Sequence, residues 1–479
     1  MTTEELIAAR RAEPWREALR KSKKNKERAD IPRVKMNELD PEYRSRTRLE
    51  EVNLGLTKEQ AMQEAERCLD CPNPTCMQGC PVNINIPTFI KNIERGEFLE
   101  AAKTLKETSA LPAVCGRVCP QEKQCESKCI HLKMGKEAVA IGYLERFAAD
   151  YERESGNISV PEIAEKNGIK IAVVGSGPAG LSFAGDMAKR GYDVTVFEAL
   201  HEIGGVLKYG IPEFRLPNKI VDVEIDGLRK MGVRFEKDCI VGKTISYDDL
   251  HADGFKGVFV ASGAGLPNFM NIPGEYLTRV NLMDAANPES DTPVLQGKKV
   301  AVIGGGNTAM DSVRTARRLG AERAMIVYRR SEEEMPARLE EVKHAKEEGV
   351  EFLTLHNPIE YIGDERGRVK QMRLQKMELG EADASGRRRP VPIEGAIETI
   401  DVDEVIVSVG VSPNPLIPRA FGGLEVSKKG TIVVEEDSMR SALGDVYAGG
   451  DIVRGGATVI LAMGDGRKAA AAMDADLRG

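Results

Sequence analysis

Residues 170–180 read KIAVVGSGPAG, an apolar run of strand type followed directly by a glycine-rich turn and the start of a helix. Glycines at GxGxxG spacing permit a tight turn, let a pyrophosphate approach the backbone and let the helix pack on its strand. The helix N-terminus favours the phosphate charge. Eighteen residues after Gly180, Glu198 ends the next strand-like run, where a carboxylate accepts ribose hydroxyl hydrogens. This stretch predicts a dinucleotide-binding βαβ unit that contains Gly175, Gly177, Pro178, Ala179, Gly180 and Glu198.

A second unit of the same kind begins at residues 298–311, KKVAVIGGGNTAMD. Its next strand ends in Arg329 and Arg330 instead of an acid, and two arginines there suit a 2′-phosphate. We therefore expect NADP(H) at the second turn and FAD at the first, where Glu198 suits an unphosphorylated ribose. The second turn comprises Gly304, Gly306, Asn307, Thr308 and Ala309.

Short β-branched runs alternate with helical stretches through both units, which is typical of parallel α/β sheets. The closing stretch, residues 445–470, contains Gly450 and Asp451, which we expect near the FAD ribityl and phosphate groups. A helix that starts near Thr458 would direct its positive end at the flavin ring. This order predicts that the second α/β domain is inserted in the first.

Residues before about 168 show helical periodicity, including a capping-box pattern at Thr57 and Gln60. The predicted fold class is α/β, with an N-terminal all-α domain followed by two Rossmann-like nucleotide-binding domains. The predicted boundaries are 1–168 for the helical domain, 169–286 and 411–479 for the two parts of the FAD domain, and 287–410 for the NADPH domain.

Eight of the nine cysteines lie between Cys68 and Cys129, in two sets of four. Cys80 precedes Pro81, as in bacterial runs where such a cysteine ligates a second cluster. Zinc is the rival metal, since structural zinc sites also use CxxC pairs. Gaps of four, three and five residues beside two flavin-type folds favour redox clusters, so we expect residues 1–168 to form an all-α iron–sulfur domain with two [4Fe-4S] clusters. The residues alone suggest eight cysteine ligands, with Cys115 included, and predict that Cys239 is an inert core thiol in a strand-like stretch.

The composition excludes several classes. The 479 residues carry a net charge of −7, which argues against nucleic-acid binding. No apolar run reaches transmembrane length, and the N-terminus lacks the apolar core of a signal peptide, so we expect a cytoplasmic protein that does not associate with membranes. Residues 16–35 hold nine basic and three acidic residues, which predicts a solvated, partly disordered arm; docking to an acidic partner is the alternative.

At these motifs the chain resembles the small (β) subunit of NADPH-dependent glutamate synthase. It is equally similar to the large subunit of electron-bifurcating NADH-dependent ferredoxin:NADP oxidoreductase and to the N-terminal half of dihydropyrimidine dehydrogenase. The resemblance begins near residue 33. It is carried by RCLDCPNPTCMQGCPV, LPAVCGRVCPQEKQCESKC, IGGVLKYGIPEFRLP, VIGGGNTAMD and YAGGDIVRG.

The resemblance implies that the two cysteine sets interleave, with Cys115 as a bystander. It implies Cys68, Cys71, Cys76 and Cys129 for the first cluster. It implies Cys80, Cys119, Cys125 and the side-chain oxygen of Glu145 for the second. It also implies FAD contacts at Gly205, Val206, Arg215 and Val241, and NADPH contacts at Arg338, Val409 and Gly410.

The expected function is that of an NADP(H)-dependent FAD/iron–sulfur oxidoreductase subunit of the glutamate synthase small-subunit type. It would pass electrons between NADP(H), FAD and two [4Fe-4S] clusters to a partner subunit. FAD carries the chemistry, so no catalytic residue is named. The resemblance implies as partner the glutamate synthase large subunit, a flavin/[2Fe-2S] small subunit or a larger bifurcating complex, with ferredoxin as a further acceptor.

Three other functions are weighed against this one. The large subunit of a bifurcating transhydrogenase is the main alternative. A zinc-containing scaffold without enzymatic activity would need degenerate nucleotide folds. A disulfide reductase of the thioredoxin reductase kind would need a CxxC pair beside the flavin, and only Cys239 lies in the α/β part of the chain.

Overall fold

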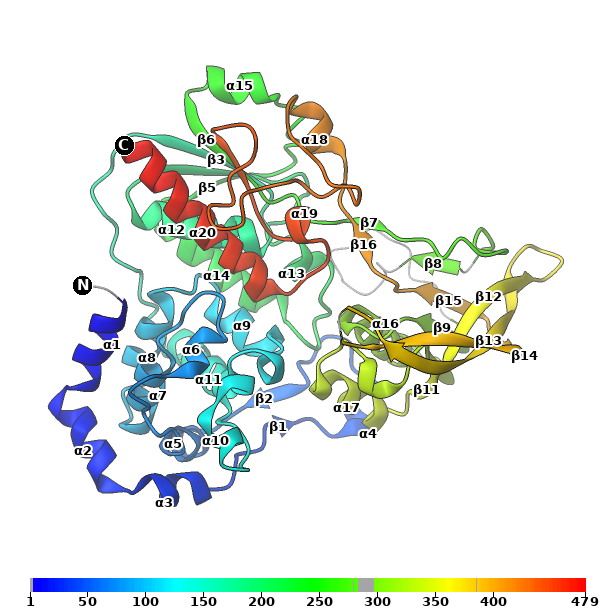
Figure 1. Cartoon of the computed structure of the whole chain (residues 1–479), viewed down its shortest axis with the longest axis horizontal. Coiled ribbons are helices and arrows are strands. Elements are labelled where there is room, and N and C mark those ends of the chain that lie inside the picture. Colours follow the sequence, from blue (N-terminus) through cyan, green and yellow to red (C-terminus); the bar gives the residue numbers. More distant parts are fainter. Residues whose placement is uncertain (1–2, 279, 283–296, 385) are drawn as a thin grey trace.

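The computed structural model describes residues 3–278, 280–282, 297–384 and 386–479. Figure 1 shows three regions: a helical region near the N-terminus, a first α/β region that also holds the C-terminal helix, and a second α/β region to one side. The helical region contains α1 (Thr3–Arg11), α2 (Pro14–Ser22), α3 (Asn25–Asp30), α4 (Pro41–Arg44), α5 (Lys58–Glu66), α6 (Thr75–Gln78), α7 (Ile86–Glu94), α8 (Phe98–Lys106), α9 (Pro112–Val118), the 3-10 helices η1 (Gln121–Lys123) and η2 (Glu126–Lys128), α10 (Ile130–Lys133) and α11 (Ile141–Ser155).

The helical region departs from an all-α fold at one small antiparallel pair, β1 (Asn37–Glu38) with β2 (Asn53–Gly55). The predicted capping box is confirmed at the start of α5. The Gln60 backbone N–H donates to Thr57 Oγ1 at 3.2 Å, and the Thr57 N–H donates to Gln60 Oε1 at 2.9 Å.

The basic N-terminal segment is folded and docked, so the expectation of a solvated arm is wrong. Arg16 is fully buried and pairs with Asp70 at 2.6 Å, and Arg20 pairs with the other oxygen of the same carboxylate at 2.6 Å. Arg28 is buried against Glu94 at 2.8 Å. The segment docks because the buried carboxylates of Asp70 and Glu94 need cations beside them.

A five-stranded parallel sheet forms the first α/β region, in the order β17-β6-β3-β4-β5. Strand β17 comes from the far end of the chain, after the whole second region, which confirms the predicted insertion. The elements of the region are β3 (Lys170–Val174), α12 (Pro178–Lys189), β4 (Asp193–Phe197), α13 (Val206–Tyr209), α14 (Asn218–Lys230), β5 (Arg234–Glu236), α15 (Tyr247–Ala252), β6 (Phe255–Val260), α18 (Leu416–Ala420), β17 (Val446–Ala448), α19 (Asp451–Arg454) and α20 (Val459–Arg478).

The second parallel sheet has the order β11-β10-β9-β15-β8. Its elements are β8 (Val280–Leu282), β9 (Lys299–Ile303), α16 (Asn307–Arg318), β10 (Arg323–Tyr328), the 3-10 helix η3 (Glu332–Glu334), α17 (Leu339–Glu347), β11 (Glu351–Thr354) and β15 (Glu404–Val407). The predicted boundary at 286/287 lies outside the described residues. Strand β8 precedes it and yet pairs with β15, so the second sheet reaches back to residue 280.

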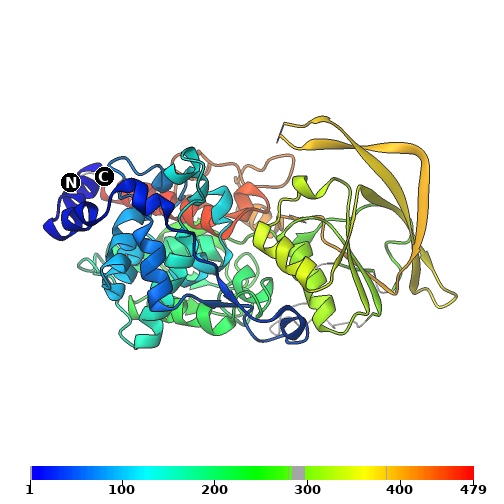
Figure 2. The same cartoon turned by 90° about the horizontal axis from the view of Figure 1, so that it is seen from below.

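Two further sheets complete the second region. The chain enters and leaves it through a short antiparallel pair, β7 (Leu266–Pro267) with β16 (Val411–Ser412). A three-stranded antiparallel sheet, which the sequence did not predict, joins β12 (His356–Gly363), β13 (Val369–Ala382) and β14 (Arg388–Asp401). Figure 2 shows this sheet projecting at the end of the molecule opposite the N-terminus.

One apolar core runs through the helical region and the first α/β region, whereas the second α/β region has cores of its own. Within the shared core, α12 and α20 cross closely. A Cβ added at Gly466 of α20 would lie 2.4 Å from the Ala179 carbonyl oxygen of α12. The first two regions therefore form one packed unit, and the second α/β region docks on that unit.

Candidate functional site

The first glycine turn links β3 to α12 and has room beside it. Gly175 has φ +101°, and a Cβ there would lie 2.5 Å from the Ala261 carbonyl oxygen. Gly177 caps α12 without a side-chain hydrogen bond, and nothing lies within 4 Å of its Cβ position. The space beside Gly177, at the N-terminus of α12, is thus open, an arrangement that suits a phosphate.

Glu198 is buried at the end of β4 and ties this turn to the sheet. Its Oε2 accepts hydrogen bonds from the Ser176 N–H at 2.9 Å and from Ser176 Oγ at 2.5 Å, and its Oε1 accepts from the Leu200 N–H at 3.0 Å. An ionised carboxylate has about four acceptor sites, so capacity remains for a ribose hydroxyl.

Two other segments converge on the same turn. A Cβ at Gly450, which has φ +76°, would lie 3.0 Å from Ala179 Cβ, and one at Gly205 would lie 3.1 Å from Gly177 Cα. Asp451 accepts a hydrogen bond from the Ala457 N–H at 3.1 Å, and burial raises its pKa.

The remaining predicted flavin contacts lie in different surroundings. Val206 is half exposed at the start of α13, and Val241 is buried. Arg215 is turned toward the second α/β region, where it pairs with Asp311 at 2.8 Å and with Glu341 at 3.3 Å.

The second glycine turn repeats the geometry of the first. Gly304 has φ +142°, and a Cβ there would lie 2.3 Å from the Ser408 carbonyl oxygen. Ala309 is buried in the first turn of α16. Since β15 pairs in parallel with β9, the Val409–Gly410 stretch that follows β15 leaves the sheet at the same edge as this turn.

The two arginines that follow β10 have different environments. Arg329 is exposed. Arg330 is buried, pairs with Asp383 at 2.8 Å and donates to the Arg388 carbonyl oxygen at 2.8 Å. Arg330 therefore anchors the turn between β13 and β14, a contact that no local sequence pattern announces.

All nine cysteines are free thiols, and eight of them fall into two groups in space. Burial raises the pKa of Cys76, and the nearby Cys68, Cys129 and Cys71 raise it further. Burial likewise raises the pKa of Cys125, and the charges of Glu126, Cys80, Glu145 and Cys119 act in the same direction. One group thus holds Cys68, Cys71, Cys76 and Cys129, and the other holds Cys80, Cys115, Cys119 and Cys125, with Glu145 beside it.

Glu145 and Cys115 both lie beside the second group. Glu145 is buried in α11, its Oε1 has no hydrogen-bond partner among the described residues, and burial raises its pKa to about 8. Cys115 is fully buried, and its thiol contacts Met463 Sδ at 3.4 Å. A buried carboxyl oxygen without a partner beside these thiols fits a metal ligand.

The second cysteine group packs against the start of α20. Gln124 Nε2 donates to Thr458 Oγ1 at 3.4 Å, and Thr458 in turn caps α20. A Cβ at Gly464 of α20 would lie 3.1 Å from Pro81, the residue after Cys80. The loops that carry this group therefore touch the helix that points toward the first glycine turn.

Cys239 lies apart from both groups. It is half-buried in the loop after β5, with its sulfur 3.5 Å from Thr244 Oγ1. It packs partly against the apolar core, but the predicted strand-like setting is wrong, because β5 ends at Glu236.

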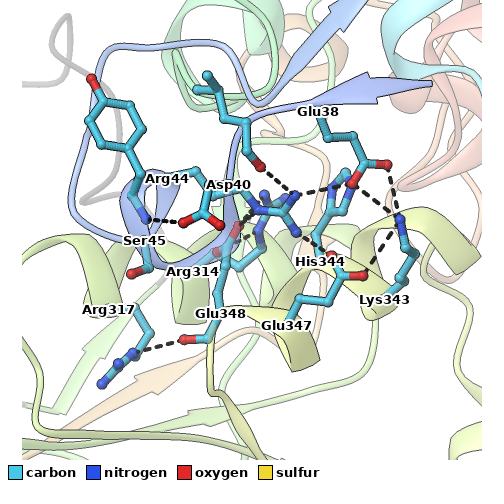
Figure 3. Close-up of polar contacts among 12 residues, drawn as sticks. Glu38, Asp40, Arg44, Ser45, Arg314, Arg317, Lys343, His344, Glu347 and Glu348 are labelled. Carbon is cyan, nitrogen blue, oxygen red and sulfur yellow. Dashed lines mark hydrogen bonds and ion pairs between the residues drawn. The ribbon is translucent and has the colours of Figure 1, made fainter.

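Helix α17 is held at its C-terminal end by the helical region (Figure 3). Arg44 is 1% exposed; its Nη2 pairs with Glu347 at 2.5 Å and its Nε with Glu348 at 3.1 Å. Glu348 also pairs with Arg314 at 2.8 Å and with Arg318 at 2.6 Å. This buried carboxylate thus joins α4, α16 and α17.

Glu38 extends this cluster. It accepts from Arg44 Nη1 at 3.1 Å and pairs with Lys343 at 3.0 Å, while His344 Nε2 lies 3.3 Å away. Glu38, His344 and Glu347 lie close enough to share a cation. Arg44 and Lys343 already balance these carboxylates, so the cluster is an ion-pair network.

The N-terminal end of α17 is held by the loop between Cys119 and Cys125. Arg338 caps α17 and sends its guanidinium to the Arg117 carbonyl oxygen and to Gln121 Oε1, the latter at 3.0 Å. Lys123 Nζ donates to the Pro336 carbonyl oxygen at 2.9 Å. The helical region therefore contacts α17 at both ends.

Removal of the Arg44 guanidinium should loosen α17. We expect Arg44→Met to cost about 3–5 kcal/mol, because it leaves buried carboxylates without a partner. Faster amide hydrogen exchange in α17 would report the loss. The matched control is Arg46→Met, whose ion pair with Glu42 is 74% and 77% exposed and should contribute under ~1 kcal/mol. Equal exchange in the two variants would contradict this account of the docking.

Two protein families match the chain. The family described as dihydropyrimidine dehydrogenase domain II, 4Fe-4S cluster, matches residues 45–157. The family described as pyridine nucleotide-disulphide oxidoreductase matches residues 169–466. Among the described residues, no helix is both long and apolar enough to cross a membrane.

Similar proteins cover most of the chain. The glutamate synthase [NADPH] small chain of Escherichia coli K12 is 37% identical over 88% of this chain and 92% of that protein. That of Azospirillum brasilense is 36% identical over 91% and 93%. The NADP(+)-dependent formate dehydrogenase subunit beta of Moorella thermoacetica is 38% identical over 84% of this chain, which spans 60% of that protein.

Solved structures share the fold of the α/β part. FprA from Mycobacterium tuberculosis in complex with NADPH superposes with a TM-score of 0.55 at 21% identity, over 65% of this chain and 85% of that chain. Thioredoxin reductase of T. acidophilum gives a TM-score of 0.50 at 20% identity, over 64% and 98%. At this identity the likeness concerns the fold.

Proposed function

The chain belongs to the family of the NADPH-dependent glutamate synthase small chain, and we propose that within it the protein carries electrons from NADPH through FAD and two [4Fe-4S] clusters to a partner subunit. It is an NADP(H)-dependent flavin iron–sulfur oxidoreductase. The observation that carries the proposal is the packing of the second cysteine group on the first turns of α20, which also lie against Ala179 beside the first glycine turn.

FAD, when bound, supplies the hydride-accepting and one-electron chemistry. The open first glycine turn, the lone pairs of Glu198 and the converging Gly450 and Gly205 support its binding here. The N-terminus of α20 at Thr458 would place positive backbone charge near the flavin ring. The chain's own residues thus bind and orient the cofactor.

NADP(H) would occupy the second glycine turn. Exposed Arg329 is free to meet a 2′-phosphate, whereas Arg330 is already held by Asp383 and would act by fixing the adjoining loop. Gly304, Asn307 and the Val409–Gly410 backbone border the same edge of the sheet.

The two clusters would be held as the resemblance implies, with Glu145 in place of an eighth cysteine. The orphaned Glu145 oxygen and the internal contact of Cys115 support this choice. The second group is buried, whereas all four cysteines of the first are partly exposed. We infer that electrons reach the second cluster first and leave through the first.

The electron acceptor would be a second redox subunit. Similar proteins are named as a small chain of glutamate synthase and as beta subunits of formate dehydrogenase and of an NADPH-Fe(3+) oxidoreductase. Partial exposure of the first cysteine group gives such a subunit a surface close to the exit cluster.

The nucleotide assignment predicts unequal effects of the two arginines. Arg329→Ala should raise the KM for NADPH by about 10- to 100-fold and barely change that for NADH, since a charge-assisted hydrogen bond contributes about 1.5–3 kcal/mol. Arg330→Ala should have the smaller NADPH-selective effect. Steady-state kinetics with both nucleotides measure this. A loss of the same size with NADH and NADPH for Arg329→Ala would contradict the assignment.

The ligand assignment predicts opposite results at Glu145 and Cys115. Wild-type protein should contain about eight irons per chain. Cys115→Ser should retain both clusters, whereas Glu145→Ala should shift or destabilise the second, because donor strength and charge change at the iron. Iron analysis and electron paramagnetic resonance of the reduced variants decide the matter. Loss of a cluster in Cys115→Ser with an unchanged Glu145→Ala would restore eight cysteine ligands.

The order of carriers predicts how Cys125→Ala behaves. Transfer to the partner should stop, while NADPH should still bleach the flavin, because hydride transfer needs only the two nucleotide sites. Stopped-flow absorbance separates these steps. A variant that retains FAD but no longer bleaches would show that the second cluster is not downstream of the flavin.

A further inference from the structure

Arg338 connects the second glycine turn to the second cysteine group. Its backbone N–H donates to Asn307 Oδ1 at 2.9 Å, and Asn307 begins α16 directly after that turn. Its guanidinium crosses to the helical region, where it meets the Arg117 carbonyl oxygen and Gln121 Oε1. One residue therefore contacts both sites.

The two acceptors flank a proposed cluster ligand, since Arg117 and Gln121 each lie two residues from Cys119. Gln121 is itself fixed in place. Its Nε2 donates to the Cys115 carbonyl oxygen at 3.3 Å, and a Cβ at Gly142, near the start of the helix that bears Glu145, would lie 2.3 Å from its side chain. A displacement of the Arg338 guanidinium would therefore displace the loop that carries Cys119.

The buried position of Arg338 strengthens the effect of its charge on neighbouring groups. The side chain is 4% exposed, and a guanidinium stays protonated at any relevant pH. Glu340 pairs with it at 3.0 Å, yet its Nε has no hydrogen-bond partner among the described residues. A buried cation in a low dielectric acts strongly on neighbouring charges.

We propose that Arg338 couples nucleotide occupancy of the second α/β region to the reduction potential of the second cluster. This inference rests on the proposed function. The cation favours the reduced, more negative cluster and so raises its potential. Nucleotide phosphates at the adjoining turn add negative charge beside Asn307 and Arg338 and lower that potential. By linkage, the nucleotide binds more weakly once the cluster is reduced.

The test uses the holoenzyme and 2′-phospho-ADP-ribose, which lacks the nicotinamide and cannot be turned over. A redox titration followed by electron paramagnetic resonance gives the midpoint of the second cluster with and without the probe. We expect the probe to lower the wild-type midpoint. Arg338→Met should lower the midpoint of the probe-free protein and abolish the probe's effect, whereas Arg338→Lys should retain most of the probe-free value.

Two variants make the result specific to this contact. Lys346→Met removes a cation from the far end of the same helix, where its ion pair with Glu332 lies outside the cluster around Glu348, and should leave both midpoints unchanged. Gln121→Leu breaks the contact from the helical region and should weaken the probe's effect, which keeps the test decisive where Arg338→Met fails to assemble. The dissociation constant of the probe should be larger for the reduced than for the oxidised wild type, and the ratio of the two constants should match the midpoint shift.

An unmoved wild-type midpoint under saturating probe would overturn the coupling, and so would a full shift in Arg338→Met. Absence of a second cluster signal, or of probe binding, in the wild type would instead count against the proposed function and remove the basis of this inference with it.

Discussion

The buried carboxylate of Glu348 is the interaction on which the arrangement of the regions depends. It lies directly after α17 and meets three guanidinium groups, of which Arg44 comes from the helical region and Arg314 and Arg318 from α16. Removal of any one of these groups would leave a charge without a partner in the protein interior. The second α/β region is therefore held in one orientation by directional ion pairs, which fix geometry more narrowly than an apolar contact does.

The other boundary is of the opposite kind. The helical region and the first α/β region share one apolar core, so that the second cysteine group and the first glycine turn cannot separate without opening that core. Electron transfer needs a constant short path, and a shared core provides one. The second α/β region has cores of its own, so nucleotide exchange there need not disturb the packing between the second cysteine group and the first glycine turn.

Local features of the fold could be predicted from the sequence, and long-range polar contacts could not. The glycine turns, the capping box at Thr57 and the insertion follow from periodicity and turn chemistry, which neighbouring residues determine. The docked N-terminal segment depends on Asp70, which lies 54 residues from Arg16, and Arg330 depends on Asp383, directly after β13 of a sheet that the sequence does not predict. Such pairs leave no spacing to detect, and for Arg215 and Arg338 the resemblance implies cofactor contacts alone.

The position of Arg338 suggests why α17 is gripped at both ends. A helix held only by the Arg44 cluster could tilt about it and carry the second glycine turn away from the loop around Cys119. A helix held at both ends passes a displacement of Asn307 on to the loop around Cys119, because the hydrogen bonds between them are short, buried and directional. The ion pairs at the far end of α17 are thus a condition for any signal at the near end, since an unanchored helix would absorb the displacement.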